Sequence, residues 1–186
     1  MKKRLVIGVS GASGVIYAIR FLEILRKINT VETHAVFTKA AETNIRIETE
    51  YTVDEVKKYC DFVHDASDLT SSICSGSFLT DGMVVIPCSM KSLSGIVHSY
   101  NDNLLIRAAD VTLKEGRKLI VVPRETPLHK GHLEMMLKLV EYGGILIPPF
   151  PAFYHAPKTI LDIIDHTLGK ILDHLGIEHE LFKRWD

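Results

Sequence analysis

The sequence predicts an α/β fold with a mostly parallel sheet and helices on both faces. Strand-like and helix-like segments alternate in the order β-α-β-α-(irregular)-β-α-α-β-α-β-α. The strand-like segments are also near-continuous apolar runs, which is typical of strands buried on both faces of a parallel sheet. At 186 residues, the chain fits a single domain spanning residues 1–186.

The composition excludes several classes of partner. The 22 Lys and Arg residues nearly balance the 23 Asp and Glu residues, so we expect no general affinity for nucleic acid or anionic membrane. Three cysteines without a CxxC pair indicate a reducing, cytoplasmic setting. We find neither a signal peptide nor an apolar run that could span a bilayer. With 46% apolar residues, we also expect apolar surface to be buried between subunits of a homo-oligomer.

The first strand–turn–helix unit favours a mononucleotide. A strand over residues 5–9 leads through Ser10-Gly11-Ala12-Ser13-Gly14 into a helix over 15–28, so backbone N–H groups at a positive helix end are available to a phosphate. The turn matches neither Walker A nor G-x-G-x-x-G. The strand over 31–37 ends in Thr38-Lys39 rather than the carboxylate of dinucleotide enzymes. FMN therefore fits better than NAD.

The middle of the chain contains its least regular segment, residues 39–77. We expect helices over 40–48 and 52–60 here, followed by a polar stretch. A strand over 83–86 then runs into a second hydroxyl-rich turn, Pro87 to Ser92, before a helix beginning at Leu93. Asn101 or Asp102 can cap a helix over 103–115, which Gly116 ends.

The last third of the chain carries an adjacent cation and carboxylate at a strand end. A strand over 119–122 runs into Pro123-Arg124-Glu125, and ligands of open α/β sheets bind beyond such carboxyl ends. The alternative is a surface ion pair. A helix over 132–142, a strand over 145–147 and a proline-rich segment follow, and Pro157 opens a final helix.

Two further sets of charges have open interpretations. Arg107, Asp110 and Lys114 share one helical face, either as a solvated salt-bridge stripe or as a cationic patch for a second anion. Lys170 lies off the apolar stripe of the final helix, where an ordinary exposed lysine is the simpler interpretation.

Seven motifs, in order and spanning nearly the whole chain, resemble those of the UbiX family of flavin prenyltransferases. They are Gly11-Ala12-Ser13-Gly14, Ser75-Gly76-Ser77, Pro87-Cys88-Ser89 with Leu93-Ser94, Arg107-Ala108-Ala109-Asp110-Val111, Leu113-Lys114-Glu115, Pro123-Arg124-Glu125 and Pro151-Ala152-Phe153-Tyr154-His155. The resemblance implies a Rossmann-like flavoprotein fold, a homododecamer, and active sites built where subunits meet.

The resemblance also implies a reaction. Family enzymes join the dimethylallyl group of dimethylallyl phosphate to N5 and C6 of reduced FMN, without a metal. The prenylated FMN then serves as the cofactor of UbiD-type decarboxylases.

By position, the resemblance assigns three sets of residues. FMN contacts fall on Gly11, Ala12, Ser13, Thr38, Ser89, Met90, Lys91, Ser92 and Arg124. Contacts to the prenyl phosphate fall on Tyr154, Lys170, Lys114, Arg107 and Ser75. Proton handling falls on Glu125, Glu48 and Ser13. We expect Glu125 to be the base and to be partly buried, because burial raises a carboxyl pKa toward the working range.

Three positions depart from the family pattern. Thr38 replaces a common Ser and keeps the hydroxyl, whereas Lys170 replaces a common Arg and loses the bidentate fork. Leu69 stands on a loop where some relatives have Trp, and the only Trp here is Trp185, in a C-terminal pair with Arg184.

The alternatives are a non-catalytic FMN carrier or accessory subunit of an aromatic-acid decarboxylase, and an FMN-dependent cysteine decarboxylase. The retained Glu125, Lys114 and Tyr154 argue against a carrier, since storage of FMN needs no second anion site. A cysteine decarboxylase needs a catalytic histidine, whereas His98 and His155 are interpreted as packing or turn residues.

Two other features are interpreted as structural. His129 and His132 are expected to face solvent at a helix start rather than bind a metal. Cys88 is expected to be a small buried hydrophobe rather than a nucleophile.

Overall fold

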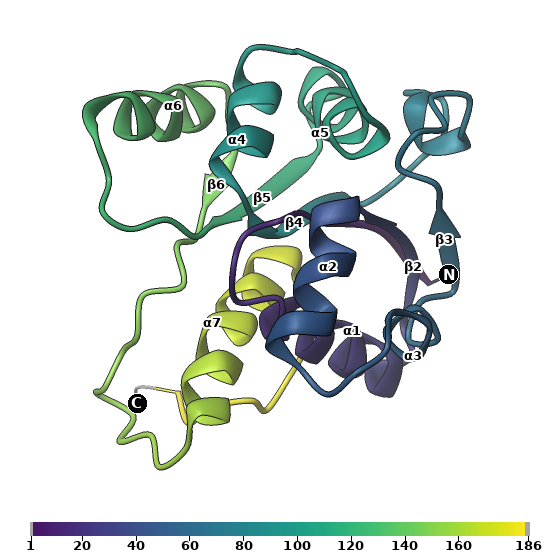
Figure 1. The fold of residues 1–186 in the computed structure, drawn as a ribbon. Coiled ribbons are helices and arrows are strands. Elements are labelled where there is room, and N and C mark those ends of the chain that lie inside the picture. Colours follow the sequence, from purple (N-terminus) through teal and green to yellow (C-terminus); the bar gives the residue numbers. More distant parts are fainter. Residues whose placement is uncertain (1, 185–186) are drawn as a thin grey trace.

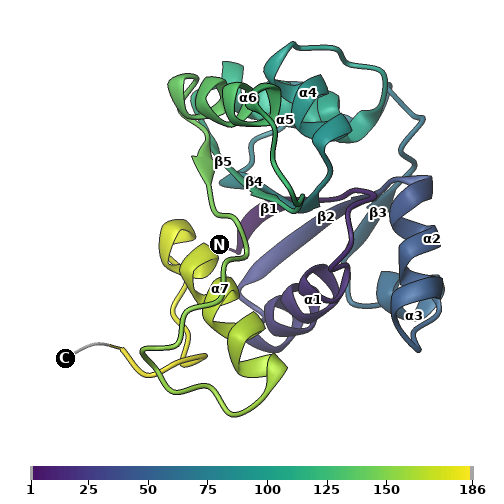
Figure 2. The ribbon, with the colours of Figure 1, turned by 60° about the vertical axis from the view of Figure 1, so that its left-hand side comes forward.

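A six-stranded, wholly parallel sheet organises the protein, with strand order β3-β2-β1-β4-β5-β6. The structure, a computed structural model, describes residues 2–184. Helices cover both faces of the sheet (Figures 1 and 2). The strand order is that of doubly wound nucleotide-binding sheets, so the predicted α/β, Rossmann-like fold class is confirmed.

The elements have the following bounds. The strands are β1 (Lys3–Val9), β2 (Val31–Phe37), β3 (Phe62–His64), β4 (Gly82–Cys88), β5 (Lys118–Pro123) and β6 (Ile145–Leu146). The helices are α1 (Ile16–Ile28), α2 (Lys39–Glu48), α3 (Val53–Lys57), α4 (Met90–Val97), α5 (Leu104–Lys114), α6 (Lys130–Glu141) and α7 (Ile160–Leu175), with a short 3-10 helix at Ser72–Cys74.

Two apolar cores lie on opposite faces of the sheet. One core contains side chains of α1, α2, α3 and α7, and the other contains side chains of α4, α5 and α6. Strand β1 contributes to both, since Ile7 belongs to the first and Val6 to the second. Double coverage explains why the central strands are continuous apolar runs. None of the helices among the described residues is long and apolar enough to cross a membrane.

The predicted elements are present, with differences that include the start of α4, which lies at Met90 rather than Leu93 because Ser89 caps the helix. Strand β3 lies within the stretch predicted to be irregular, where its three residues and the half-exposed Phe62 leave almost no apolar pattern. Helix α7 begins at Ile160, with Thr159 rather than Pro157 at its start, because Thr159 and Asp162 form a capping box. Asn103, rather than Asn101 or Asp102, caps α5.

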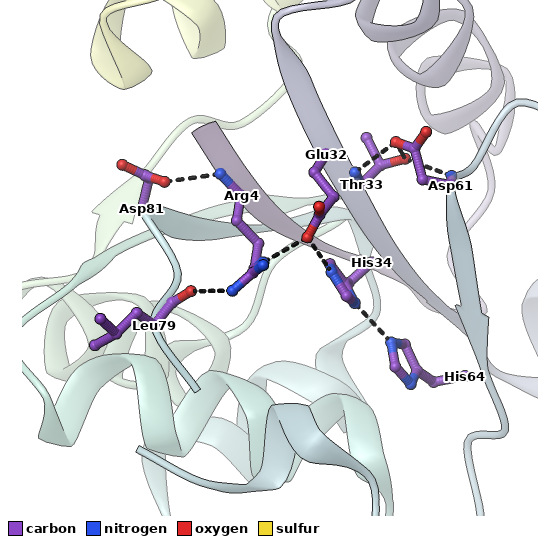
Figure 3. Close-up of polar contacts among 8 residues, drawn as sticks. All are labelled: Arg4, Glu32, Thr33, His34, Asp61, His64, Leu79 and Asp81. Carbon is purple, nitrogen blue, oxygen red and sulfur yellow. Dashed lines mark hydrogen bonds and ion pairs between the residues drawn. The ribbon is translucent and has the colours of Figure 1, made fainter. Parts of the chain in front are cut away.

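A chain of polar contacts ties the β3 edge to the centre of the sheet (Figure 3). Arg4 Nε donates to Glu32 Oε1 at 2.5 Å, and the same oxygen lies 3.0 Å from His34 Nε2. His34 Nδ1 lies 2.9 Å from His64 Nε2, and His64 Nδ1 lies 2.8 Å from Ser71 Oγ. The segment after β3 is therefore anchored to β1 through side chains of β2.

Two groups in this network have shifted pKa values. Burial, followed by the neighbouring His34, lowers the pKa of His64 below 6.5. Hydrogen bonds from His34 and then Arg4 lower the pKa of Glu32 below 4.5. A lowered folded pKa means that the unfolded chain binds more protons, so each group stabilises the fold above its unfolded pKa. This stabilisation is lost as the pH falls through the folded pKa.

We predict that His64 contributes to acid sensitivity below pH 6.5, separately from carboxylates such as Glu32. The wild-type free energy of unfolding should fall when the pH drops from 7.5 to 5.5, and His64→Gln should fall less, because it lacks the titrating group. Urea unfolding at equal chain concentrations measures both. An unchanged pH dependence in His64→Gln would contradict the assignment.

Candidate active site

The carboxyl ends of β1 and β4 are joined by one buried hydroxyl. Ser10 Oγ donates to the Pro87 carbonyl at 3.1 Å and accepts from the Ser89 amide at 2.8 Å. The connection after β1 leads to one face of the sheet, and that after β4 leads to the other. This is the topological switch point, where doubly wound sheets open a crevice for ligands.

The turn between β1 and α1 is occupied by a carboxylate. Glu48, at the end of α2, accepts from the amides of Gly14 at 2.8 Å and Val15 at 3.2 Å. A negative charge here neutralises the positive end of α1. The expectation that these two N–H groups are available to a phosphate is therefore wrong, but Glu48 and Ser13 are brought together.

Neighbouring residues of α2 shape the same turn. Asn44 Nδ2 donates to the Ala12 carbonyl at 3.0 Å. A Cβ on Gly11 would come within 2.3 Å of the Ala40 Cβ, so the close approach of α2 requires glycine here. Asn44 was not among the residues predicted from the sequence. Its position one turn before Glu48 on α2 was the available signal.

Arg124 and Glu125 point to different partners. Arg124 Nε donates to the Ser13 carbonyl at 3.2 Å, and its amide donates to the Cys88 carbonyl at 3.1 Å. Glu125 Oε1 instead accepts from the Thr126 amide at 3.0 Å. Arg124 therefore lies at the turn that follows β1, while its contact with FMN stays a prediction. Glu125 is exposed, so the expected partial burial is wrong for a single chain.

Two predicted hydroxyls act as helix caps. Ser89 accepts from the Ser92 amide at 3.2 Å at the start of α4, and Thr38 accepts from the Ala41 amide at 3.2 Å at the start of α2. Met90 and Lys91 form the first turn of α4, whose leading amides have no partner within the helix. Lys91 is exposed, with its Nζ 3.4 Å from Asp102. The leading amides of α4 and the Lys91 ammonium are donors suited to a phosphate monoester.

A second group of predicted residues lies at the opposite edge of the sheet. Lys114 ends α5 just before β5, and its ammonium contacts Glu115. Gly76 lies against both, since a Cβ there would meet the Glu115 carboxylate at 2.0 Å, so Ser75 is near this pair. Arg124 follows the other end of β5, whose six residues span about 20 Å. Within one chain, Lys114 and Arg124 therefore lie at opposite ends of β5.

Arg107 is held within α5. Its guanidinium donates to Asp110 at 3.1 Å, and Asp110 also accepts from Ser99 and Asn101. Part of the cationic face is thus the salt-bridge stripe of the alternative interpretation.

A third group lies on the outer surface of α7. Tyr154 and Lys170 line a pocket of about 460 Å³ together with Phe182 and Arg184. The Tyr154 hydroxyl lies 2.5 Å from His166 Nε2. His166 was not among the residues predicted from the sequence, although it lies one helical turn before the predicted site residue Lys170. Lys170 is exposed. Trp185 lies outside the described residues.

The other side chains with reactive groups have packing or capping roles. Burial raises the pKa of the Cys88 thiol far above neutrality, so it is a protonated core residue, as expected. His129 is exposed and caps α6, but His132 is only partly exposed, with its ring centroid 3.6 Å from that of His129. Among residues 2–184, no group of three or more His, Cys, Asp or Glu side chains could hold a metal ion.

The fold and the switch-point site define a flavoprotein. The family model described as Flavoprotein matches residues 1–182, and the chain belongs to this family. Within it, the chain is a UbiX-type flavin prenyltransferase. It is 53% identical over 185 residues to the flavin prenyltransferase UbiX of Salmonella typhimurium, covering 98% of both chains.

Two solved structures support the same assignment. A dodecameric FMN-dependent UbiX-like decarboxylase from Escherichia coli O157:H7 is 49% identical, with a TM-score of 0.96 over 98% of this chain and 99% of that one. AnUbiX (PadA1), solved with FMN and dimethylallyl pyrophosphate, is 43% identical, with a TM-score of 0.97 over 100% and 98% of the two chains.

We predict that Lys114 and Glu125 act on one substrate only across a subunit boundary. Lys114→Ala and Glu125→Gln oligomers should each be impaired in the prenyl transfer proposed below. Subunits of the two variants coexpressed in equal amounts should regain activity, because about a quarter of the sites then carry both native residues. The prenyl-transfer rate per chain measures this.

The control coexpresses Lys114→Ala with Lys114→Met, which leaves no site with a native Lys114. Failure of the mixed Lys114→Ala and Glu125→Gln oligomer to exceed its parents would show that the two residues do not serve one site from different subunits.

Proposed function

We propose that this chain joins a dimethylallyl group from dimethylallyl phosphate to N5 and C6 of reduced FMN, producing prenylated FMN for a UbiD-type decarboxylase. The observation that carries the proposal is full-length identity of 53% to a flavin prenyltransferase. The convergence of Ser13, Glu48 and Arg124 at the switch point supports it.

The carboxyl edge of the sheet fits FMN. The amides at the start of α4 and the Arg124 guanidinium would hold its phosphate, while the turn from Gly11 to Ser13 would lie along the ring system. Reduced FMN supplies the nucleophilic N5 and C6 atoms when bound. The chain's own contribution at this edge is to bind and orient the acceptor.

The prenyl phosphate requires fixed cations and hydroxyls. Departure of its phosphate leaves an anion, which preorganised donors stabilise without a metal. Tyr154 and Lys170 form one such donor pair, and Lys114, Arg107 and Ser75 are further contacts by position. Their separation within the chain is consistent with donors that come from neighbouring subunits.

Proton handling falls to the carboxylates. Glu125, just after the end of β5, would take the proton that C6 loses. Glu48 and Ser13, at the turn after β1, would assist. Assembly with a neighbouring subunit would give Glu125 the burial that the single chain lacks, and burial raises a carboxyl pKa.

Assembly and location belong to the same proposal. We expect a homododecamer, as reported for the UbiX-like relative, in the cytoplasm. Half-exposed or more exposed apolar side chains support burial between subunits, among them Leu133, Leu137, Phe150, Phe153 and Ile160. The alternative role, a non-catalytic FMN carrier, gives no use to the pocket at Tyr154 and Lys170.

We predict that the assembled protein, given reduced FMN and dimethylallyl phosphate under anaerobic conditions, forms a flavin heavier by one prenyl unit. Mass spectrometry of the released flavin detects it. Reactions without protein or without the prenyl donor are the controls. Bound FMN without any adduct, in an assembled oligomer, would favour the carrier.

We predict that Glu125→Gln retains FMN binding but slows formation of the ring-closed product by at least about a hundredfold, because the amide cannot accept the C6 proton. FMN content and product formation are measured on the same preparation. Product formation at the wild-type rate would remove Glu125 from the mechanism.

A further inference from the structure

His166 is a buried polar residue that contacts Tyr154, a predicted substrate-binding residue. It lies on α7 and is only 7% exposed, and its Nε2 atom is 2.5 Å from the Tyr154 hydroxyl. Tyr154 itself is 52% exposed and lines the pocket with Lys170. The pair therefore connects the core-facing side of α7 to the open pocket.

Aromatic contacts fix the His166 ring on several sides. The ring of His155 stacks on it, with centroids 4.6 Å apart and planes 6° apart. Phe182 packs at 4.8 Å, and Tyr154 meets the ring edge-to-face at 5.2 Å. A ring held in this way keeps its Nε2 atom aimed at one point.

The hydrogen bond has two possible directions, and a bound anion selects one. A tyrosine hydroxyl carries a single proton. When Tyr154 donates that proton to a phosphate, its oxygen can only accept from His166, so Nε2 must carry a hydrogen. The imidazole, unlike a carboxylate, can both accept from and donate to a hydroxyl.

The surroundings keep His166 neutral at neutral pH. Burial, followed by the nearby His155 and Lys170, lowers its pKa below 6.5. A neutral ring with hydrogen on Nε2 meets the requirement set by a phosphate bound to Tyr154, without placing a further buried charge beside Lys170.

We propose that His166 is a positioning residue for the prenyl donor: its Nε2–H donates to the Tyr154 hydroxyl and directs the Tyr154 proton at the substrate phosphate. This role rests on the proposed function, in which Tyr154 and Lys170 bind that phosphate. His166 itself does not touch the substrate.

The test compares steady-state kinetics of assembled His166→Leu and His166→Gln. Leucine fills space without a donor, so KM for dimethylallyl phosphate should rise about tenfold, the value of one hydrogen bond, while kcat stays within about twofold. Glutamine can place an amide N–H near the Nε2 position and should restore KM to within about threefold of wild type. His166→Met replaces the leucine variant if the latter fails to assemble, with the same expectation.

A double-mutant cycle separates positioning from general damage to α7. In a Tyr154→Phe background, His166→Leu should change KM by less than about twofold, because the bond is already absent. His174→Leu, an exposed histidine on the same helix, is the matched control and should match wild type.

Three outcomes would overturn the proposal: an unchanged KM in His166→Leu, a loss confined to kcat, or additive effects with Tyr154→Phe. In each case wild-type product formation shows that the proposed function itself stands. Absence of product from the wild type would instead reject the proposed function.

Discussion

The direction of the parallel strands is the constraint on which the site depends. Every strand of the sheet points the same way, so residues that follow strands collect at one edge and residues that precede them collect at the other. Arg124 follows β5, whereas Lys114 precedes it. No loop movement within a compact chain closes a gap of about 20 Å through a packed sheet. If both residues serve one reaction, a second subunit must bring the second edge to the first.

The switch point shows how carboxylates and cations share a nucleotide-type turn. Glu48 accepts hydrogen bonds from two amides at the start of α1. This turn therefore binds a carboxylate of the same chain, whereas phosphate-binding turns leave such amides open to the ligand. The flavin phosphate must then rely on other donors, of which the start of α4 and Arg124 are the nearest in the sheet order. The same arrangement places a carboxylate beside Ser13, where a proton acceptor is useful.

Much of the fold could be predicted from the sequence because its signals are local. Continuous apolar runs and helical periodicity identified β1, β2, β4 and β5 with their crossover helices, whereas the three-residue β3 carries too little pattern to detect. For the site, the sequence predicted which residues take part but not which contacts they make. That Glu48 reaches Gly14, and that Arg124 turns toward Ser13 rather than Glu125, depends on how α2 and β5 pack against the first turn. Sequence spacing contains no such information.

Several cations of the site already have carboxylate partners in the single chain. Lys114 contacts Glu115 and Arg107 donates to Asp110, so a phosphate must compete with these carboxylates or share the cations with them. Such pairing lowers the cost of burying cations at a subunit boundary while no anion is bound. Tyr154 also has a partner within the chain, but a neutral one. The His166 imidazole can either accept a hydrogen bond from the Tyr154 hydroxyl or donate one to it. A site that must bind and release a phosphate dianion is thus built from donors whose alternative partners lie within the chain.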